Sequence, residues 1–344
     1  MNEWLTDFGM FLAQLLAVVV VVGLAAAALI RARGGEGERS RLRLEELNGE
    51  RRRRRRRLQL VASPPGARKR LRKAFRRDDK ARGKAGGGAE RTPLVWVLDF
   101  HGDLKASGAG RLAEEVSALL DVAEAGDEAV IRLESPGGLV HAYGHAAAEL
   151  DRLREAGMRT TVCVDRVAAS GGYLMACGAD RLRVAPFAVL GSIGVVAQLP
   201  NVHRLLKRHD VDVEVLTAGR YKRTLTVLGE NTEEGREKFL EDLEAVHGQF
   251  KRHVAARRPG LDIEAVATGE VWYGEAAVEK GLADEVGTSE AYLRERLDQA
   301  RVVSLRLERR RNLADRLGLA VSRGVEQGLE RGLEALEARG WQKR

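Results

Sequence analysis

Short apolar runs alternate with helix-patterned segments through the middle of the 344-residue chain. Runs rich in valine, leucine and isoleucine are typical of buried strands, and apolar residues three or four positions apart are typical of helices. We expect strands at residues 94–100, 129–134, 159–164, 181–184, 211–216 and 302–307, and helices at residues 111–125, 140–156, 232–257, 261–270 and 274–281. This alternation predicts an α/β fold with a largely parallel sheet, in which ligands gather beyond the carboxyl ends of the strands.

The first apolar run, residues 8–30, differs from the others in its length. About 20 apolar residues in a helix span the hydrocarbon core of a bilayer, and Gln14 is the only strongly polar residue in this run. The preceding flank contains Glu3 and Asp7, whereas a cleaved signal peptide begins with basic residues. We therefore favour one uncleaved transmembrane helix over a signal peptide, with residues 1–33 forming the anchor and its flank.

Positive charge is concentrated in the next segment. Residues 31–92 contain 23 Lys and Arg residues against 8 Asp and Glu residues, including seven consecutive arginines at 51–57 and a second cluster at 68–73. We predict a basic, partly disordered and partly helical linker over residues 34–92, and such a segment can also bind anionic membrane lipid. Aromatic residues that would stack on bases are nearly absent from it, so we expect no nucleic-acid partner.

The rest of the chain divides into a compact domain at residues 93–300 and a C-terminal strand with an amphipathic helix at residues 301–344. Cys163 and Cys177 both lie in apolar surroundings. We interpret them as buried free thiols and not as a disulfide or a nucleophile.

Two glycine motifs follow predicted strands. They are Ser-Pro-Gly-Gly at residues 135–138 and Ala-Ala-Ser-Gly-Gly at residues 168–172. Ser170 suits a tight strand-to-helix turn in which its hydroxyl faces a ligand, and the backbone N–H groups of Gly138 and Gly171 could stabilise an oxyanion. Taken singly, a serine here is more often a helix cap, and Ser-Pro-Gly-Gly is a common turn.

A serine nucleophile needs a general base, for which the chain offers a lysine or a histidine. Lys222, in the segment 218–224, could serve if burial kept its amine neutral, although a lone lysine in a polar loop is usually solvated. His141 and His145 are four residues apart, which also permits a metal pair. The sequence between them lacks the glutamate of a His-Glu-x-x-His motif, so we favour a helix surface and expect no metal.

Several motifs together resemble a known family. They are Val-Leu-Asp-Phe-His-Gly-Asp (97–103), Leu-Glu-Ser-Pro-Gly-Gly (133–138), Val-Ala-Ala-Ser-Gly-Gly-Tyr (167–173), Gly-Ser-Ile-Gly-Val (191–195), Ala-Gly-Arg-Tyr-Lys-Arg-Thr-Leu-Thr (218–226), Gly-Glu-Asn-Thr-Glu-Glu-Gly-Arg (229–236), Thr-Gly-Glu-Val-Trp-Tyr-Gly-Glu (268–275) and Glu-Lys-Gly-Leu-Ala-Asp-Glu (279–285). Over residues 93–287 the chain is similar to SohB-type inner-membrane proteases of the signal peptide peptidase A family.

The resemblance implies a ClpP/crotonase-like fold and a serine endopeptidase with a serine–lysine dyad. Ser170 would be the nucleophile and Lys222 the general base, and Ser192 would be a further hydroxyl that orients the lysine. It implies no cofactor, and peptide or protein substrates such as signal-peptide remnants or membrane-protein fragments. It also implies a homo-oligomer in which neighbouring subunits complete the catalytic site.

The same resemblance implies a single-pass protein of the bacterial inner membrane. Related peptidases work outside the cytoplasmic membrane, but the arginine-rich flank favours a cytoplasmic side by the positive-inside rule. We favour the cytoplasmic side. Two alternatives to the peptidase are a crotonase-like acyl-thioester enzyme, which would bind coenzyme A, and a non-catalytic membrane scaffold with the same fold.

Overall fold

The computed structural model describes residues 40–85 and 93–309. The chain divides into one unit of residues 1–42 with 307–344 and a second unit of residues 43–306. Of the first unit, only residues 40–42 and 307–309 are among the described residues. Residues 40–42 begin the strand Ser40–Glu46, and residues 307–309 end the strand Arg301–Arg309.

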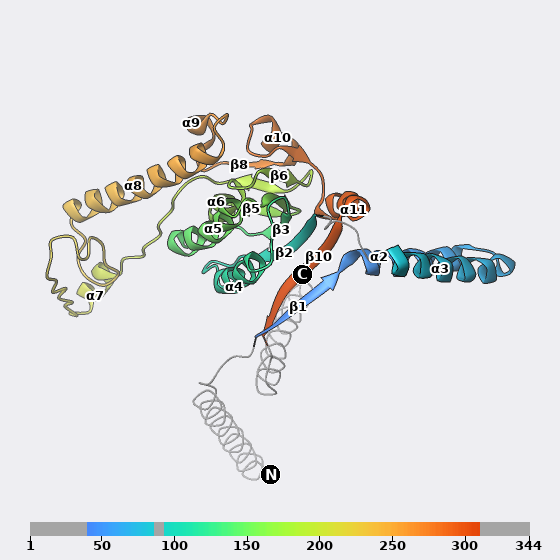
Figure 1. Ribbon diagram of the computed structural model, residues 1–344. Helices are drawn as coiled ribbons and strands as arrows, with labels where there is room; N and C mark the ends of the chain where they lie inside the picture. Colours follow the sequence, from blue (N-terminus) through green and yellow to red (C-terminus); the bar gives the residue numbers. More distant parts are fainter. Residues whose placement is uncertain (1–39, 86–92, 310–344) are drawn as a thin grey trace, which may run out of the picture. The chain divides into compact units, whose positions relative to one another are not determined.

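The described residues form ten strands and ten helices, with helices between most of the strands of the large sheet (Figure 1). The strands are β1 (Ser40–Glu46), β2 (Leu94–His101), β3 (Glu128–Glu134), β4 (Arg159–Val164), β5 (Val167–Ala169), β6 (Arg181–Val184), β7 (Val189–Gly191), β8 (Val271–Tyr273), β9 (Glu285–Val286) and β10 (Arg301–Arg309). The helices are α2 (Leu47–Ala62), α3 (Pro65–Ala85), α4 (Ala109–Leu120), α5 (Val140–Glu155), α6 (Gly171–Ala176), α7 (His203–Arg208), α8 (Glu233–Arg257), α9 (Ile263–Val266), α10 (Gly274–Glu279) and α11 (Ser289–Gln299).

Seven of the described strands form one sheet in the order β1-β10-β2-β3-β4-β6-β9. The neighbours from β10 to β9 all pair in parallel, as in the register Val97↔Val130 and Val130↔Thr161. A smaller sheet has the order β5-β7-β8, with β5 parallel and β8 antiparallel to β7. The prediction of an α/β fold with largely parallel sheets is confirmed.

Both faces of the large sheet are covered, which explains why its strands are apolar along nearly their whole length. Side chains alternate between the faces along β2. Trp96 and Leu98 belong to the larger core, with apolar residues of α4, α5 and α6, whereas Val95 and Val97 pack with Tyr292 of α11. Figure 1 shows α4, α5 and α6 gathered beside β2 and β3.

Most predicted elements are present, but residues 211–216 form no strand. Their alternating pattern is typical of a half-buried strand, yet no described strand pairs with them, and an unpaired strand leaves its backbone groups without partners. Leu216 is 88% exposed. The helix expected at residues 261–270 is reduced to α9, which begins after the Asp262 cap and ends before Gly269, a glycine with φ of +86°.

Two predictions fall outside the described residues. The expected membrane span at residues 8–30 and the expected C-terminal helix at residues 312–341 both lie outside them. Within residues 40–85 and 93–309, no helix is both long and apolar enough to cross a membrane. In the segment predicted as a basic linker, residues 34–92, the structure contains strand β1 and the helices α2 and α3, which pack against each other through Arg56 and Phe75.

Candidate active site

The two glycine motifs lie side by side at the ends of β3 and β5. Ser135, which directly follows β3, forms a parallel bridge with Ala168 of β5. The Ser135 amide donates to Val167 O at 2.8 Å, and the Ala169 amide donates to Ser135 O at 3.0 Å. Because parallel strands end at the same edge of a sheet, the two motifs meet where a ligand would be expected.

Ser170 occupies a sharp turn between β5 and α6. Its backbone has φ of 51° and ψ of −120°, a conformation that residues with a Cβ rarely adopt and that costs on the order of 1–3 kcal/mol. The turn is held by hydrogen bonds from the Ser170 amide to Gly191 O (2.8 Å) and from the Leu174 amide to Ser170 O (2.9 Å). Although Ser170 is in the N-cap position of α6, its side chain makes no cap hydrogen bond. The half-buried hydroxyl is therefore not used as a helix cap.

The predicted oxyanion donors surround this turn. Within the described residues, the amides of Gly138 and Gly171 donate no hydrogen bond. Gly171 is the first residue of α6, where the amides have no partner inside the helix. A Cβ on Gly138 would come within 2.1 Å of Leu104 O, and one on Gly171 within 2.4 Å of Tyr143 Cγ, so only glycine fits at either position.

A buried hydrogen-bond chain supports the Ser-Pro-Gly-Gly turn, and sequence reasoning did not identify it. The Gly137 amide donates to Ser135 Oγ (3.1 Å), Ser135 Oγ bonds Tyr143 Oη (2.6 Å), and Tyr143 Oη donates to the Asp103 carbonyl (2.7 Å). Ser135 and Tyr143 are both fully buried, and burial raises the pKa of Tyr143. Nothing in the sequence around Tyr143 distinguishes it from an ordinary core tyrosine of α5.

Lys222, the predicted base, is exposed in the single chain. It lies in a turn in which its amide donates to Gly219 O at 3.1 Å. Within the described residues, its side chain makes no hydrogen bond with Ser170 or with any other residue. Burial of Lys222, on which its role as a neutral base depends, is therefore not found in one chain. Neighbouring Arg220 forms an ion pair with Glu234 at 2.6 Å.

Ser192 is connected to Ser170 through the backbone. It follows Gly191, whose carbonyl accepts the Ser170 amide, and it also has a positive φ of 51°. The Ser192 amide donates to Glu270 O at 2.6 Å. The structure therefore places Ser192 beside the turn of the predicted nucleophile but does not bring Lys222 to it.

Two histidines of α8 contact the backbone on either side of this region. His247 Nε2 lies 3.2 Å from the carbonyl of Ile193, the residue after Ser192, and His253 Nε2 lies 3.1 Å from the carbonyl of Leu174 in α6. Burial lowers the pKa of His253, with a smaller contribution from Arg257. Both histidines act as backbone supports. The sequence shows only a long charged helix here, without a signal for these contacts.

No histidine among the described residues is hydrogen-bonded to Ser170. His141 and His145 lie exposed on α5, as predicted. No group of three or more His, Cys, Asp or Glu side chains in the described part of the chain is arranged to hold a metal ion. Cys163 and Cys177 are free and buried, which confirms their interpretation, and burial raises the pKa of each thiol to about 12.

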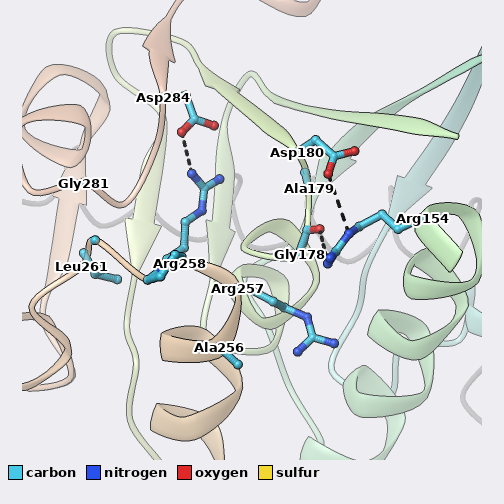
Figure 2. Close-up of a pocket in the computed structure, with 12 residues that line it drawn as sticks. Arg154, Gly178, Ala179, Asp180, Ala256, Arg257, Arg258, Leu261, Gly281 and Asp284 are labelled. Atoms are coloured by element: carbon cyan, nitrogen blue, oxygen red, sulfur yellow. Dashed lines mark hydrogen bonds and ion pairs between the residues drawn. The ribbon is translucent and has the colours of Figure 1, made fainter. Parts of the chain in front are cut away.

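A surface cavity of about 400 Å³ lies elsewhere, between the ends of α6 and α8 (Figure 2). Its walls carry mixed charge: Arg258 pairs with Asp284 at 2.6 Å, and Arg154 donates to Gly178 O at 3.2 Å. Gly178 follows the C-terminal end of α6, whereas Ser170 precedes the N-terminal end. This cavity is therefore not the candidate active site.

The chain matches two protein-family models in succession. The model described as peptidase family S49 N-terminal matches residues 3–150, and the model described as peptidase family S49 matches residues 152–303. Similar curated proteins include "Probable protease SohB" of Haemophilus influenzae, 54% identical over 229 residues that cover 67% of this chain and 65% of that protein. "Probable protease SohB" of Buchnera aphidicola subsp. Acyrthosiphon pisum is 47% identical over 235 residues, which cover 68% and 70%.

The chain therefore belongs to peptidase family S49, among its SohB-type members. The match spans slightly less than two thirds of the Haemophilus protein. Among solved structures, a mutant of the 1510-N membrane-bound stomatin-specific protease in complex with a substrate peptide is similar at 13% identity and a TM-score of 0.39, covering 68% of this chain and 99% of that one.

Proposed function

We propose that this protein is a serine endopeptidase in which Ser170 is the nucleophile and Lys222 the general base. The observation that carries the proposal is the Ser170 turn: a strained serine without a cap hydrogen bond, next to two glycine amides that donate no hydrogen bond in the described part of the chain. Membership of peptidase family S49 supports the same chemistry. We assign the domain to the ClpP/crotonase-like fold on the same grounds.

In the proposed reaction, Ser170 Oγ attacks the carbonyl carbon of the scissile peptide while the neutral amine of Lys222 takes its proton. The amides of Gly138 and Gly171 donate to the oxyanion that develops on the carbonyl oxygen. Lys222 then gives the proton to the leaving amine, and an acyl-enzyme remains on Ser170. Lys222 then takes a proton from a water molecule that attacks the ester; the ester C–O bond breaks, the acid product leaves, and Lys222 returns the proton to Ser170 Oγ. Ser192 would hold the lysine amine in place.

A homo-oligomer would supply the missing half of the site. Lys222 is exposed and lies within residues 195–232, a segment that also exposes large apolar side chains such as Val196 (91%) and Leu216 (88%). Apolar side chains this exposed favour contact with another protein surface. In our proposal that surface belongs to a second copy, so that Lys222 of one subunit is buried beside Ser170 of the next.

We place the protein at the bacterial inner membrane, anchored by the apolar residues 8–30, where extended peptides such as signal-peptide remnants or membrane-protein fragments would be its substrates. The site needs no cofactor for this reaction. A reporter domain fused after residue 344 would determine on which side of the membrane the catalytic domain lies.

The proposed activity is tested by peptide hydrolysis with the full chain in detergent or membranes. Ser170→Ala and Lys222→Ala should each lower turnover at least about 10³-fold, because a nucleophile and its base act as one unit. Both variants should unfold at the temperature of the original protein. Full activity in Lys222→Ala would refute the base assignment. Coenzyme A binding without hydrolysis in the unmutated chain would refute the peptidase itself.

A further inference from the structure

Helices α2 and α3 form a helical pair that we call the basic hairpin (Figure 1). Residues 47–85 contain 17 Lys and Arg residues against 3 Asp and Glu residues. Arg56 lies between the two helices, where it pairs with Asp78 and Asp79 at 2.8 Å and its guanidinium carbon is 5.0 Å from the centre of the Phe75 ring. Two of the three acidic residues are therefore engaged by a cation inside the hairpin.

The N-terminal end of α2 is fixed to the compact domain by hydrogen bonds and an ion pair. Asn48 Nδ2 donates to the carbonyls of Leu297 and Ala300, at 3.1 and 2.9 Å, and Asn48 Oδ1 accepts the Val302 amide at 2.7 Å. Arg51 forms an ion pair with Asp298 at 2.7 Å. The hairpin is therefore held where α11 meets β10, and its remaining cations are not needed for this attachment.

Many of these remaining cations are exposed and without a counter-charge. Within the described residues, no ion pair is formed by the exposed side chains of Arg53, Arg55, Arg57, Arg68, Lys69, Arg70, Arg72, Lys73, Arg76, Arg77 and Lys80. Like charges on adjacent turns repel one another and destabilise a helix. A surface that carries this many unneutralised cations is suited to a polyanionic partner.

The apolar residues of the hairpin indicate which kind of polyanion binds there. Leu58 and Val61, at the end of α2 beside the turn into α3, are 70% and 73% exposed among the cations. A membrane interface accommodates both, because headgroups take the charges and the acyl boundary takes the apolar side chains. Nucleic acid would favour exposed aromatic residues, but Phe75 is half-buried beneath Arg56. The apolar residues 8–30 precede the hairpin by a short stretch of sequence.

We propose that the basic hairpin is a docking surface for the anionic phospholipid headgroups of a membrane. In this role it is a second membrane contact, separate from the expected span and from the catalytic residues. Headgroup binding would neutralise the repulsion between α2 and α3 and would hold the compact domain close to the bilayer.

The test measures how close the hairpin comes to lipid headgroups in the full chain. Ala74, exposed on α3, is replaced in an Ala74→Cys, Ser170→Ala chain and labelled with a fluorophore; Cys163 and Cys177 are buried and do not compete for the label. The chain is reconstituted into phosphatidylcholine vesicles with or without phosphatidylglycerol, each carrying a nitroxide quencher on the headgroup. We expect several-fold stronger quenching with phosphatidylglycerol, and loss of the difference at about 1 M salt, where charges are screened within ~3 Å.

Two variants that each lose four positive charges distinguish the effect of the hairpin's cations from the effect of the protein's total charge. The hairpin variant combines Lys69→Gln, Arg72→Gln, Lys73→Gln and Arg76→Gln. The control variant combines Arg159→Gln, Arg208→Gln, Arg252→Gln and Lys280→Gln, which are exposed positions outside the hairpin. Quenching in the hairpin variant should fall to its value in neutral vesicles, with helix content by circular dichroism unchanged, while the control variant keeps the phosphatidylglycerol dependence.

Three outcomes would overturn the proposal. The first is equal quenching in neutral and anionic vesicles, and the second is an equal loss in both variants. The third is that the chain binds a single-stranded RNA at about 0.15 M salt while quenching does not depend on phosphatidylglycerol. This result would assign the hairpin to nucleic acid. Peptide hydrolysis is not a readout in any arm, so this proposal and the proposed peptidase can fail independently.

Discussion

Gly137 lies directly against Ser170: a Cβ atom on Gly137 would come within 2.7 Å of both Ser170 Cβ and Gly171 N. Gly137 also has φ of +91°, which side-chain-bearing residues rarely adopt. The Ser-Pro-Gly-Gly motif therefore forms one wall of the turn that presents the predicted nucleophile. Through this contact the motif and Ser170, which are 35 positions apart in sequence, form one site.

Gly137→Ala should damage this site more than the fold. We expect a loss of about 1–3 kcal/mol in the free energy of unfolding from overpacking and backbone strain, and at least a roughly 10²-fold loss of peptide turnover because Ser170 is displaced. Urea unfolding and peptide hydrolysis measure the two effects. The matched control is Gly144→Ala in α5, where a Cβ meets nothing within 4 Å. Unchanged turnover in Gly137→Ala would contradict the role given to this contact.

Tyr143→Phe removes the middle of the buried hydrogen-bond chain. Ser135 Oγ and the Asp103 carbonyl would each lose a partner, so the free energy of unfolding should fall by about 1–3 kcal/mol. Tyr273→Phe, at a tyrosine that is 55% exposed, is the control and should change it by less than about 0.5 kcal/mol. Chemical denaturation compares the two variants. Equal effects would mean that the Ser135–Tyr143–Asp103 chain does not support the turn.

His253 predicts a pH dependence of stability. Burial lowers its pKa below the ordinary value of about 6.5, so the folded state prefers the neutral ring. Its contribution to stability is therefore complete above pH ~6.5 and is lost as the pH falls through the lowered pKa of the folded state. In His253→Gln, the amide can still donate to Leu174 O but does not titrate. The free energy of unfolding should fall less between pH 7.5 and 5.5 in this variant; identical slopes would rule out the His253 effect.

Mixing two inactive variants tests whether the site is shared between subunits. If Lys222 of one subunit serves Ser170 of its neighbour, Ser170→Ala chains mixed with equal amounts of Lys222→Ala chains should regain about a quarter of the original turnover. Random assembly of a closed ring gives this fraction of complete sites. Subunit exchange is followed in parallel by energy transfer between labelled chains. Exchange without any recovery would place both residues of a working site in the same chain.

The sequence predicts the central strands well because their apolar runs are long enough to be buried from both sides. It also predicts that the motifs at residues 135–138 and 168–172 follow strands, which is sufficient to bring them together in a parallel sheet. Residues 211–216 have the alternating pattern of a strand but do not form one, because no strand in the described part of the chain pairs with them. Pairing depends on distant residues and cannot be predicted from a local pattern.

The hydrogen bonds that support the site also join residues that are far apart in sequence. Tyr143 reaches the Asp103 carbonyl 40 residues away, and His247 reaches the Ile193 carbonyl 54 residues away. Neither contact has a spacing that marks it in the sequence. Whether Lys222 becomes buried in an assembly could not be predicted either, because a lysine in a polar loop has the same local sequence whether or not another subunit covers it.

The central claim, that Ser170 is the nucleophile, is tested most directly by covalent labelling. The intact chain in its native membrane is treated with a fluorophosphonate probe, and the adduct is located by mass spectrometry of proteolytic peptides. We predict an adduct on Ser170 that is absent in Ser170→Ala and that forms at least about 10²-fold more slowly in Lys222→Ala. An adduct on Ser135 or Ser192 with Ser170 unlabelled, or hydrolysis that persists in Ser170→Ala, would contradict the claim.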